Sequence, residues 1–546
     1  MPRNLCGLCF SAAVAAFVSF YAAAITVAQP SRAAETPLGR ISFPTSGSPN
    51  AQQSFLRGVL FLHSFEYDDA IEAFRQAQRA DPAFAMAYWG EALAYNQPLW
   101  FNEDVAKARA ALAKLKAAPT AREQGYLDAV QRLYGPGDKA TRDRAYADRM
   151  GELSRRFPDD DEAAAFYALA LLGTIPSGGR DQAVSLKAGG IALAILKKNP
   201  QHPGAAHYAL HAFDDGEHAA MGLEAARTYA RIAPASSHAR HMPSHVFLPL
   251  GMWDEAVASD ESAFAASVDL AKRKGLSAAQ YDFHSLSWLQ YEYLQQGRFA
   301  KARETMAEVQ RALAVPAPPA RSALPAHPAH VESEIGKGFN PISLKSELAS
   351  MKARLVVESG DWALMKGQGS FDNIDELFAL GAASVRLGDK GRADAALEHL
   401  GNAATSIPDR DAKEIAQIMR DELDGLMREA AKDKAGSVAA FARAAALEAK
   451  RAKPIARPYP VKPAAELYGE ALLRAGDAAG AVVQFQASLA RTPRRASSLL
   501  GLARAAKAAG KPVDAARAAK EFLTAWHIAD PGRSELAEAR ALARQP

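Results

Sequence analysis

The sequence is almost without cysteine, and its only two, Cys6 and Cys9, lie close to the start of the chain. The segment around them holds an apolar run over 5–27 and ends in small residues at Ala33 and Ala34, which is typical of a secretory signal peptide. We therefore expect residues 1–34 to be cleaved and the mature protein to be periplasmic or secreted. The alternative is a retained anchor, because the run is long enough to span a bilayer.

A mature chain without thiols excludes several classes of site at once. Disulfides, iron–sulfur clusters, cysteine zinc sites and cysteine nucleophiles all require the missing residue. Any metal ion would have to be held by histidine, aspartate and glutamate.

Strong charge of either sign is also missing. The formal net charge of +4 falls to +2 when Arg3 and Arg32 leave with the signal peptide. This balance gives no argument for nucleic acid as a partner, nor for a membrane after cleavage. The sequence also lacks a phosphate-binding glycine loop, a GxSxG elbow and an HExxH motif. A binding protein is therefore expected in preference to an enzyme.

The segment from Ala51 has the spacing of a helical repeat. Counted from Ala51, offsets 8, 11, 20, 24, 27 and 32 hold Gly58, Phe61, Ala70, Phe74, Ala77 and Pro82. Small residues at offsets 8 and 20 let two helices approach closely, large residues at 11 and 24 fill the seam, and the proline ends the second helix. The pattern resembles the tetratricopeptide repeat. It implies an all-α fold, a superhelix or α-solenoid of antiparallel helix hairpins.

The same period recurs along the chain, since Pro200 and Pro234 are separated by one full repeat, as are Ala481 and Ala515. Proline-rich stretches at 315–330 and 450–463 interrupt it. The predicted divisions are an N-terminal tetratricopeptide array with a histidine-rich groove at 35–312, a proline-rich linker at 313–345, a middle helical segment at 346–450 and C-terminal repeats at 464–546.

Histidine is concentrated in one part of the chain, because eight of the thirteen lie within 202–284. His207 and His211 are four positions apart, and His241 and His245 repeat that pair one full period later. Residues four apart share one face of a helix. The spacing therefore predicts two equivalent histidine pairs on adjacent repeats.

The predicted histidine face also includes other polar residues. On a helical wheel, Asp214 lies with His207 and His211 on an arc that is separate from the apolar packing face. In tetratricopeptide proteins this arc lines the concave groove, so the resemblance implies a ligand-facing cluster. His238 and His284 are expected to belong to it as further ligand-binding residues.

Such a cluster suits a divalent transition-metal ion. A histidine pair four residues apart can hold one ion, and neighbouring helices about 8–10 Å apart leave a gap that imidazoles can close. We predict His207, His211, His241, His245 and Asp214 as metal ligands. Zinc, copper, nickel, iron and manganese all accept such ligands. Two alternatives stay open, a groove for a peptide or small anion and histidines with a structural role.

Three further positions bear on the groove. Pro243 either kinks the helix that carries His245 or marks the start of a new helix. Trp89 and Asn96, in the second repeat, are additional candidates for ligand contact. Trp89 takes a groove-facing offset, where an aromatic residue either contacts a peptide or packs.

The motifs HYALHAFDD (207–215) and HMPSHVF (241–247), together with PVKPAAELYGEALLRAG (460–476), are similar to those of a biochemically undefined family of exported bacterial tetratricopeptide proteins. The resemblance implies architecture and export but no activity. The predicted function is a binding or scaffold protein that holds a protein, peptide or metal-bearing ligand in its concave groove. The alternative is a metal-dependent, hydrolase-like enzyme in which Asp215 or Glu217 is the base.

Overall fold

The computed structural model describes residues 38–176, 179–314, 344–367, 372–457 and 459–544. The predicted signal peptide, and residues 315–343 of the predicted linker, lie outside these ranges. The regular secondary structure of the described part is helical, apart from a short antiparallel ladder between β1 (Asn96–Gln97) and β2 (Asn102–Glu103). No described helix combines the length and the apolar character that a bilayer crossing requires.

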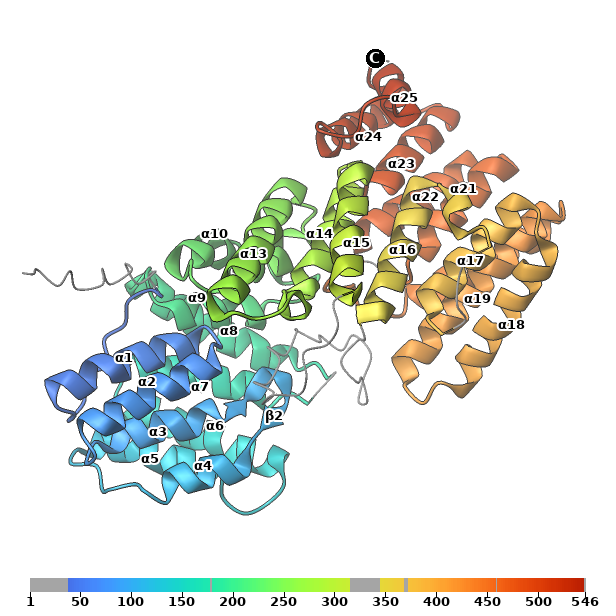
Figure 1. Cartoon of the computed structure of the whole chain (residues 1–546). Coiled ribbons are helices and arrows are strands. Elements are labelled where there is room, and N and C mark those ends of the chain that lie inside the picture. Colours follow the sequence, from blue (N-terminus) through green and yellow to red (C-terminus); the bar gives the residue numbers. More distant parts are fainter. Residues whose placement is uncertain (1–37, 177–178, 315–343, 368–371, 458, 545–546) are drawn as a thin grey trace, which may run out of the picture. The chain divides into compact units, whose positions relative to one another are not determined.

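Consecutive helices pack against one another, as expected for stacked hairpins (Figure 1). The first helices are α1 Pro49–His63, α2 Tyr67–Ala80, α3 Ala85–Ala94, α4 Val105–Leu112, α5 Ala121–Leu133, α6 Lys139–Arg156, α7 Asp161–Gly173 and α8 Gln182–Lys198, with the 3₁₀ turn η1 Pro98–Trp100. Contacts are not restricted to neighbours in sequence, since α1 also packs against α9.

The first repeat shows why its residues form a close hairpin. A Cβ atom added at Gly58 would lie 2.7 Å from the ring of Phe74, and one added at Gly90 would lie 2.3 Å from the same ring. Phe74 therefore fills the space left by glycines on α1 and α3. The helix-contact roles predicted for offsets 8 and 24 are confirmed.

The middle of the chain contains α9 Pro203–Ala212, η2 Ala219–Gly222, α10 Leu223–Ile232, α11 Ser237–His241, α12 Ser244–Phe247, α13 Trp253–Lys274, η3 Ala278–Gln280, α14 Phe283–Gln295 and α15 Phe299–Ala314. Pro243 separates α11 from α12, so that the second predicted pair, His241 and His245, comes from two short helices. The hydroxyl of Ser244 donates to the carbonyl of His241 at 2.8 Å at this break.

The remaining elements are α16 Leu344–Ser359, η4 Trp362–Met365, α17 Ile374–Leu387, α18 Lys390–Ser406, α19 Arg410–Ala430, α20 Lys434–Glu448, α21 Ala464–Ala475, α22 Ala478–Arg491, α23 Ala496–Ala508, α24 Pro512–Ala525 and α25 Ser534–Ala543. The predicted C-terminal repeats contact the array directly. Trp253 donates from Nε1 to the carbonyl of Arg494 at 3.0 Å, and the amide of Ala496 donates to the side chain of Gln295 at 3.1 Å.

Candidate metal centre

Helix α9 is fixed at its start by its own sequence and by a close approach to α1. The backbone amide of Ala205 donates to Nδ1 of His202 at 3.1 Å, and Pro203 occupies the first turn, where no amide hydrogen is needed. A Cβ atom at Gly204 would lie 2.2 Å from Nδ1 of His63, the last residue of α1. The absence of a side chain at Gly204 therefore lets the end of α1 lie against α9.

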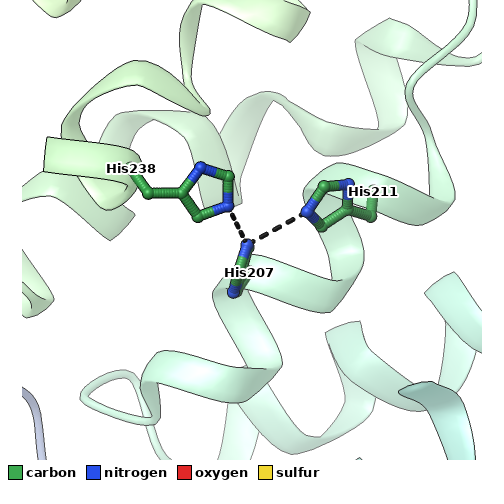
Figure 2. A group of neighbouring side chains, drawn as sticks. All are labelled: His207, His211 and His238. Atoms are coloured by element: carbon green, nitrogen blue, oxygen red, sulfur yellow. Dashed lines mark hydrogen bonds between the residues drawn. The ribbon is translucent and has the colours of Figure 1, made fainter. Parts of the chain in front are cut away.

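Three imidazoles converge beside this contact, and we call His207, His211 and His238 the first histidine centre. His207 and His211 come from α9 and His238 from α11, and Figure 2 shows the three rings pointing toward one another. Nε2 of His207 lies 2.7 Å from Nε2 of His238 and 3.1 Å from Nε2 of His211. The ring of His207 is buried, whereas the other two are half-buried.

The hydrogen-bond partner of His207 fixes which of its nitrogens carries the proton. Nδ1 lies 2.7 Å from the carbonyl oxygen of His63, which can only accept, so Nδ1 is the donor. Burial lowers the pKa of His207 to about 3, so the ring is neutral and Nε2 has a lone pair. That lone pair faces the two other Nε2 atoms. A carbonyl on the far nitrogen is the usual way in which proteins orient a metal-binding histidine.

The separations suit an ion at the point where the nitrogens meet. A tetrahedral ion with metal–nitrogen bonds of about 2.0–2.1 Å holds its ligand nitrogens about 3.3 Å apart. The contacts of 2.7 and 3.1 Å are a few tenths of an ångström shorter. One lone pair on His207 cannot serve two donors at full strength, whereas a cation interacts with all three nitrogens. The first histidine centre therefore has the geometry and the donor set of a three-histidine metal site.

An aromatic side chain in an unusual backbone conformation covers these rings. Phe65 has φ of 59°, the left-handed region that side chains other than glycine seldom adopt. Its ring centroid lies 4.2 Å from that of His207, 5.6 Å from that of His211 and 5.8 Å from that of His238. The strained turn after α1 thus places an apolar wall against the centre.

A second group of three imidazoles, the second histidine centre, consists of His241, His245 and His284. Nε2 of His245 lies 3.0 Å from Nε2 of His241, and His284 offers a ring nitrogen within 4.8 Å of both partners' ligand atoms. The far nitrogens face carboxylates, since Nδ1 of His241 lies 2.6 Å from Oδ1 of Asp260 and Nδ1 of His245 lies 2.9 Å from Oδ2 of Asp214.

The surroundings of the second histidine centre are buried and aromatic. The ring of Trp288 lies 4.4 Å from that of His245 and 5.2 Å from that of His241. Burial and the neighbouring Asp260 raise the pKa of Glu292, and burial together with Asp282 raises the pKa of Asp260. The two acids therefore form a buried pair next to His241.

A third group, the Glu162 network, consists of His63, Glu162 and His202, whose side chains bind one another and neighbouring protein groups. Nε2 of His63 lies 2.8 Å from Glu162 Oε2, while the hydroxyl of Tyr208 lies 2.8 Å from Nδ1 of the same ring. Nε2 of His202 makes an ion-pair contact of 3.2 Å with Glu162 Oε1, and its Nδ1 already accepts from the Ala205 amide. These contacts are those of a structural network, and it supports the His63 carbonyl that orients His207.

Electrostatics in the Glu162 network favour a charged carboxylate in spite of its burial. Burial alone would raise the pKa of Glu162, but the adjacent His202 and His63 hold it at about 2. Burial also lowers the pKa of His63. Glu162 therefore stays ionised over the whole physiological range.

The predicted site residues are brought together in a different combination from the one expected. The two predicted pairs do not share a site, because each is completed by another histidine: His238 joins His207 and His211, while His284 joins His241 and His245. Asp214, predicted as a metal ligand, accepts from the far nitrogen of His245 instead. The expectation that the histidines face an open groove is wrong for His207, His241 and His245, which are buried.

Other predicted positions lie apart from both centres. Trp89 is a core residue with no exposed surface, in ring contact with Phe43 and Tyr126, so it cannot line a groove. Asn96 is buried in β1 and accepts from Lys139 at 3.4 Å. This buried position does not suit the ligand contact predicted for Asn96.

Of the two acids predicted as a general base, Asp215 holds a turn with its side chain, whereas the side chain of Glu217 is exposed. Both carboxylate oxygens of Asp215 lie 2.8–2.9 Å from Nδ1 of His218, and one of them also accepts from the backbone amide of Glu217 at 2.7 Å. Asp215 therefore has its hydrogen-bonding capacity committed within this loop.

Sequence reasoning missed Asp260, although a signal was present. Asp260 follows Ala256 by four positions and precedes Ala263 by three, so it lies on the same buried face of α13 as these two residues. An acid on the apolar face of a helix must be paired or protonated when buried. Glu162 and His202 carried no comparable signal, since their meeting depends on how α1, α7 and α9 pack.

Three solved structures match this chain over most of its length, at low sequence identity and low TM-score. A crystal structure of the APC/C hetero-tetramer Cut9–Hcn1 has 12% identity and a TM-score of 0.28, over 92% of this chain and 78% of that one. The human IFIT1 dimer with m7Gppp-AAAA has 13% identity and a TM-score of 0.33, over 89% and 91%. Yeast Tom70 has 12% identity and a TM-score of 0.29, over 86% and 92%.

The described part of the chain is an all-α stack of consecutive antiparallel helices, the fold class that the sequence predicts. No protein-family model and no curated protein matches its sequence at a significant level.

Proposed function

We propose that this tetratricopeptide-type protein is an exported binding protein that holds a divalent transition-metal ion at the first histidine centre. The observation that carries the proposal is the convergence of three Nε2 atoms, on rings of which one, His207, is oriented by the His63 carbonyl. His211 and His238 are half-buried, so an ion held there stays within reach of a ligand from solution.

The donor set narrows the choice of metal. Three imidazoles suit zinc, copper(II) and nickel, whereas manganese prefers carboxylate and water oxygens. By the usual order of affinities, copper(II) binds most tightly to such a site, and zinc is the redox-inert choice. A metal with an open coordination position can in turn bind a carboxylate or imidazole of a protein or peptide, which connects the centre to the binding role.

Zinc titration of the metal-free protein tests the proposal. Wild type, His211→Ala and His399→Ala are stripped with chelator, and zinc binding is followed by calorimetry. His399 is an exposed histidine of α18 and serves as the matched control. We expect His211→Ala to lose affinity by more than the roughly 10- to 100-fold that loss of an orienting partner causes. His399→Ala should bind as wild type does. Equal zinc binding by all three proteins would contradict the proposal.

A second function is favoured by one feature of the same centre. Three histidines with an accessible fourth position are the ligand set of several catalytic zinc sites, in which the ion activates water. The zinc-loaded protein would then hydrolyse an activated ester, and His211→Ala would not. Tight zinc binding without turnover on esters and phosphoesters would limit the protein to the binding role.

Export is proposed from the N-terminal segment. Expression of the full chain followed by N-terminal sequencing of the product tests it. Cleavage near Ala34 supports export, and an intact N-terminus in a cytoplasmic fraction would contradict it.

A further inference from the structure

The second histidine centre poses an electrostatic problem that the first does not. The carboxyl groups of Asp260 and Asp214 lie 2.6 and 2.9 Å from the Nδ1 atoms of His241 and His245. When each Nδ1 is the donor, each neutral ring presents a lone pair at Nε2. These two Nε2 atoms lie 3.0 Å apart. In that tautomer the two lone pairs repel each other unless a cation lies between them.

A metal ion removes this repulsion and uses the third ring. Three imidazole nitrogens within 4.8 Å of one another can close on an ion with metal–nitrogen bonds of about 2.0–2.1 Å. Carboxylates on the far nitrogens fix the tautomer and make the rings stronger donors. The arrangement at His241 and His245 is this carboxylate–histidine pairing, present twice in one centre.

The two histidine centres differ in the acidic groups that can balance the charge of a bound ion. A divalent ion at the second centre would lie one ring away from Asp260 and Asp214, and its charge would favour the ionised form of both carboxyl groups. Both His241 and His245 are buried, and a buried ion requires compensating charge of this kind. At the first centre the orienting partner of His207 is a neutral carbonyl, and two of the rings reach solvent.

We propose that the protein has a second metal site, formed by His241, His245 and His284, and that this site binds a divalent transition-metal ion more tightly than the first. The two sites adjoin along α11, because His238 of one and His241 of the other are one helical turn apart. The second site holds its ion permanently, while the first exchanges its ion or its ligand. The inference extends the proposed function but does not require the first site to be occupied.

Zinc content and affinity of the wild type, three variants and one control variant test the inference. Metal-free wild type, His284→Ala, His211→Ala and Asp260→Asn are titrated with zinc, and bound zinc per chain is measured after desalting. Asp254→Asn, an exposed acid in the first turn of the same helix as Asp260, is the matched control. Far-UV circular dichroism and the urea midpoint confirm that each variant is folded, and Asp214→Asn replaces Asp260→Asn if the latter fails to fold.

We expect wild type to bind two zinc ions per chain. His284→Ala should lose the tighter step and His211→Ala the weaker one. Asp260→Asn should weaken the tighter step roughly 10- to 100-fold and leave the weaker step unchanged, because an amide orients His241 less well than a carboxylate.

The outcomes separate this inference from the proposed function. Suppose that wild type binds one ion, that His284→Ala keeps it and that His211→Ala loses it. This result would overturn the proposal of a second site and support the first site. One ion that is lost by His284→Ala and kept by His211→Ala would overturn the first and support the second. Two ions with no effect of His284→Ala would also overturn the inference, since the ions would then lie elsewhere.

Discussion

Replacement of Gly204 by alanine tests the link between helix packing and the first histidine centre. The added Cβ would lie 2.2 Å from Nδ1 of His63 and 2.8 Å from two of its ring carbons. His63 cannot move away easily, because Glu162 and Tyr208 hold its two nitrogens and its ring is stacked on Phe166 at a centroid distance of 5.0 Å. Overpacking of a filled core costs about 1–3 kcal/mol.

Replacement of Gly190 by alanine is a control for which we expect the opposite change in the free energy of unfolding. It lies exposed in α8, where an added Cβ meets no atom within 4 Å. Alanine is favoured over glycine inside a helix by about 0.8–1.0 kcal/mol. Gly190→Ala should therefore raise the free energy of unfolding while Gly204→Ala lowers it. Urea unfolding in the presence of chelator, followed by far-UV circular dichroism, compares the two variants without any contribution from metal.

The same substitution should weaken zinc binding without touching a ligand. When His63 is displaced, its carbonyl no longer holds Nδ1 of His207, and loss of such a partner lowers metal affinity roughly 10- to 100-fold. Gly190→Ala should bind zinc as wild type does. A Gly204→Ala protein with wild-type stability and wild-type zinc affinity would refute the reasoning that connects α1, His63 and the centre.

Three further predictions follow from other contacts. The folded-state pKa of Glu162 is depressed from 4.5 to about 2. The ionised carboxylate therefore stabilises the folded protein by about 3 kcal/mol above pH 4.5, and this stabilisation is lost as the pH falls toward 2. Urea midpoints measured against pH should show the loss in wild type and less of it in Glu162→Gln. Arg495 lies 2.7 Å from Glu466 and 2.6 Å from Glu358, and all three side chains are buried. Arg495→Met should destabilise the protein by about 3–5 kcal/mol, because it leaves both glutamates without this partner. An unchanged urea midpoint would contradict this prediction. Copper(II) should quench tryptophan fluorescence less in Trp288→Phe than in wild type, since Trp288 lies 4.4 Å from His245; equal quenching would place the copper elsewhere.

The repeat architecture could be predicted from a few residues because the repeat is a local unit. Gly58 and Phe74 are 16 positions apart and meet across one hairpin, so their spacing alone implies their contact. Phe485 fills the same role near the end of the chain, where a Cβ at Gly469 would lie 3.2 Å from its ring. The position of Pro243 predicted an interruption, and its form, two short helices, follows from the lost amide hydrogen.

The composition of the centres was harder to predict, since it depends on contacts between repeats. The spacing of one full repeat identified His207 and His241 as equivalent positions, but equivalent positions on adjacent helices need not meet. The turn into α11 brings His238 to His207, and the start of α14 brings His284 to His241. Burial could not be inferred either, because it arises from Phe65 and Trp288, which come from other parts of the chain.

Diffraction at the zinc absorption edge from crystals of the zinc-loaded protein tests the central claim most directly. We predict an anomalous peak about 2.0–2.1 Å from Nε2 of His207, His211 and His238. Anomalous peaks confined to surface carboxylates, with the three rings still in contact through their nitrogens, would contradict the claim.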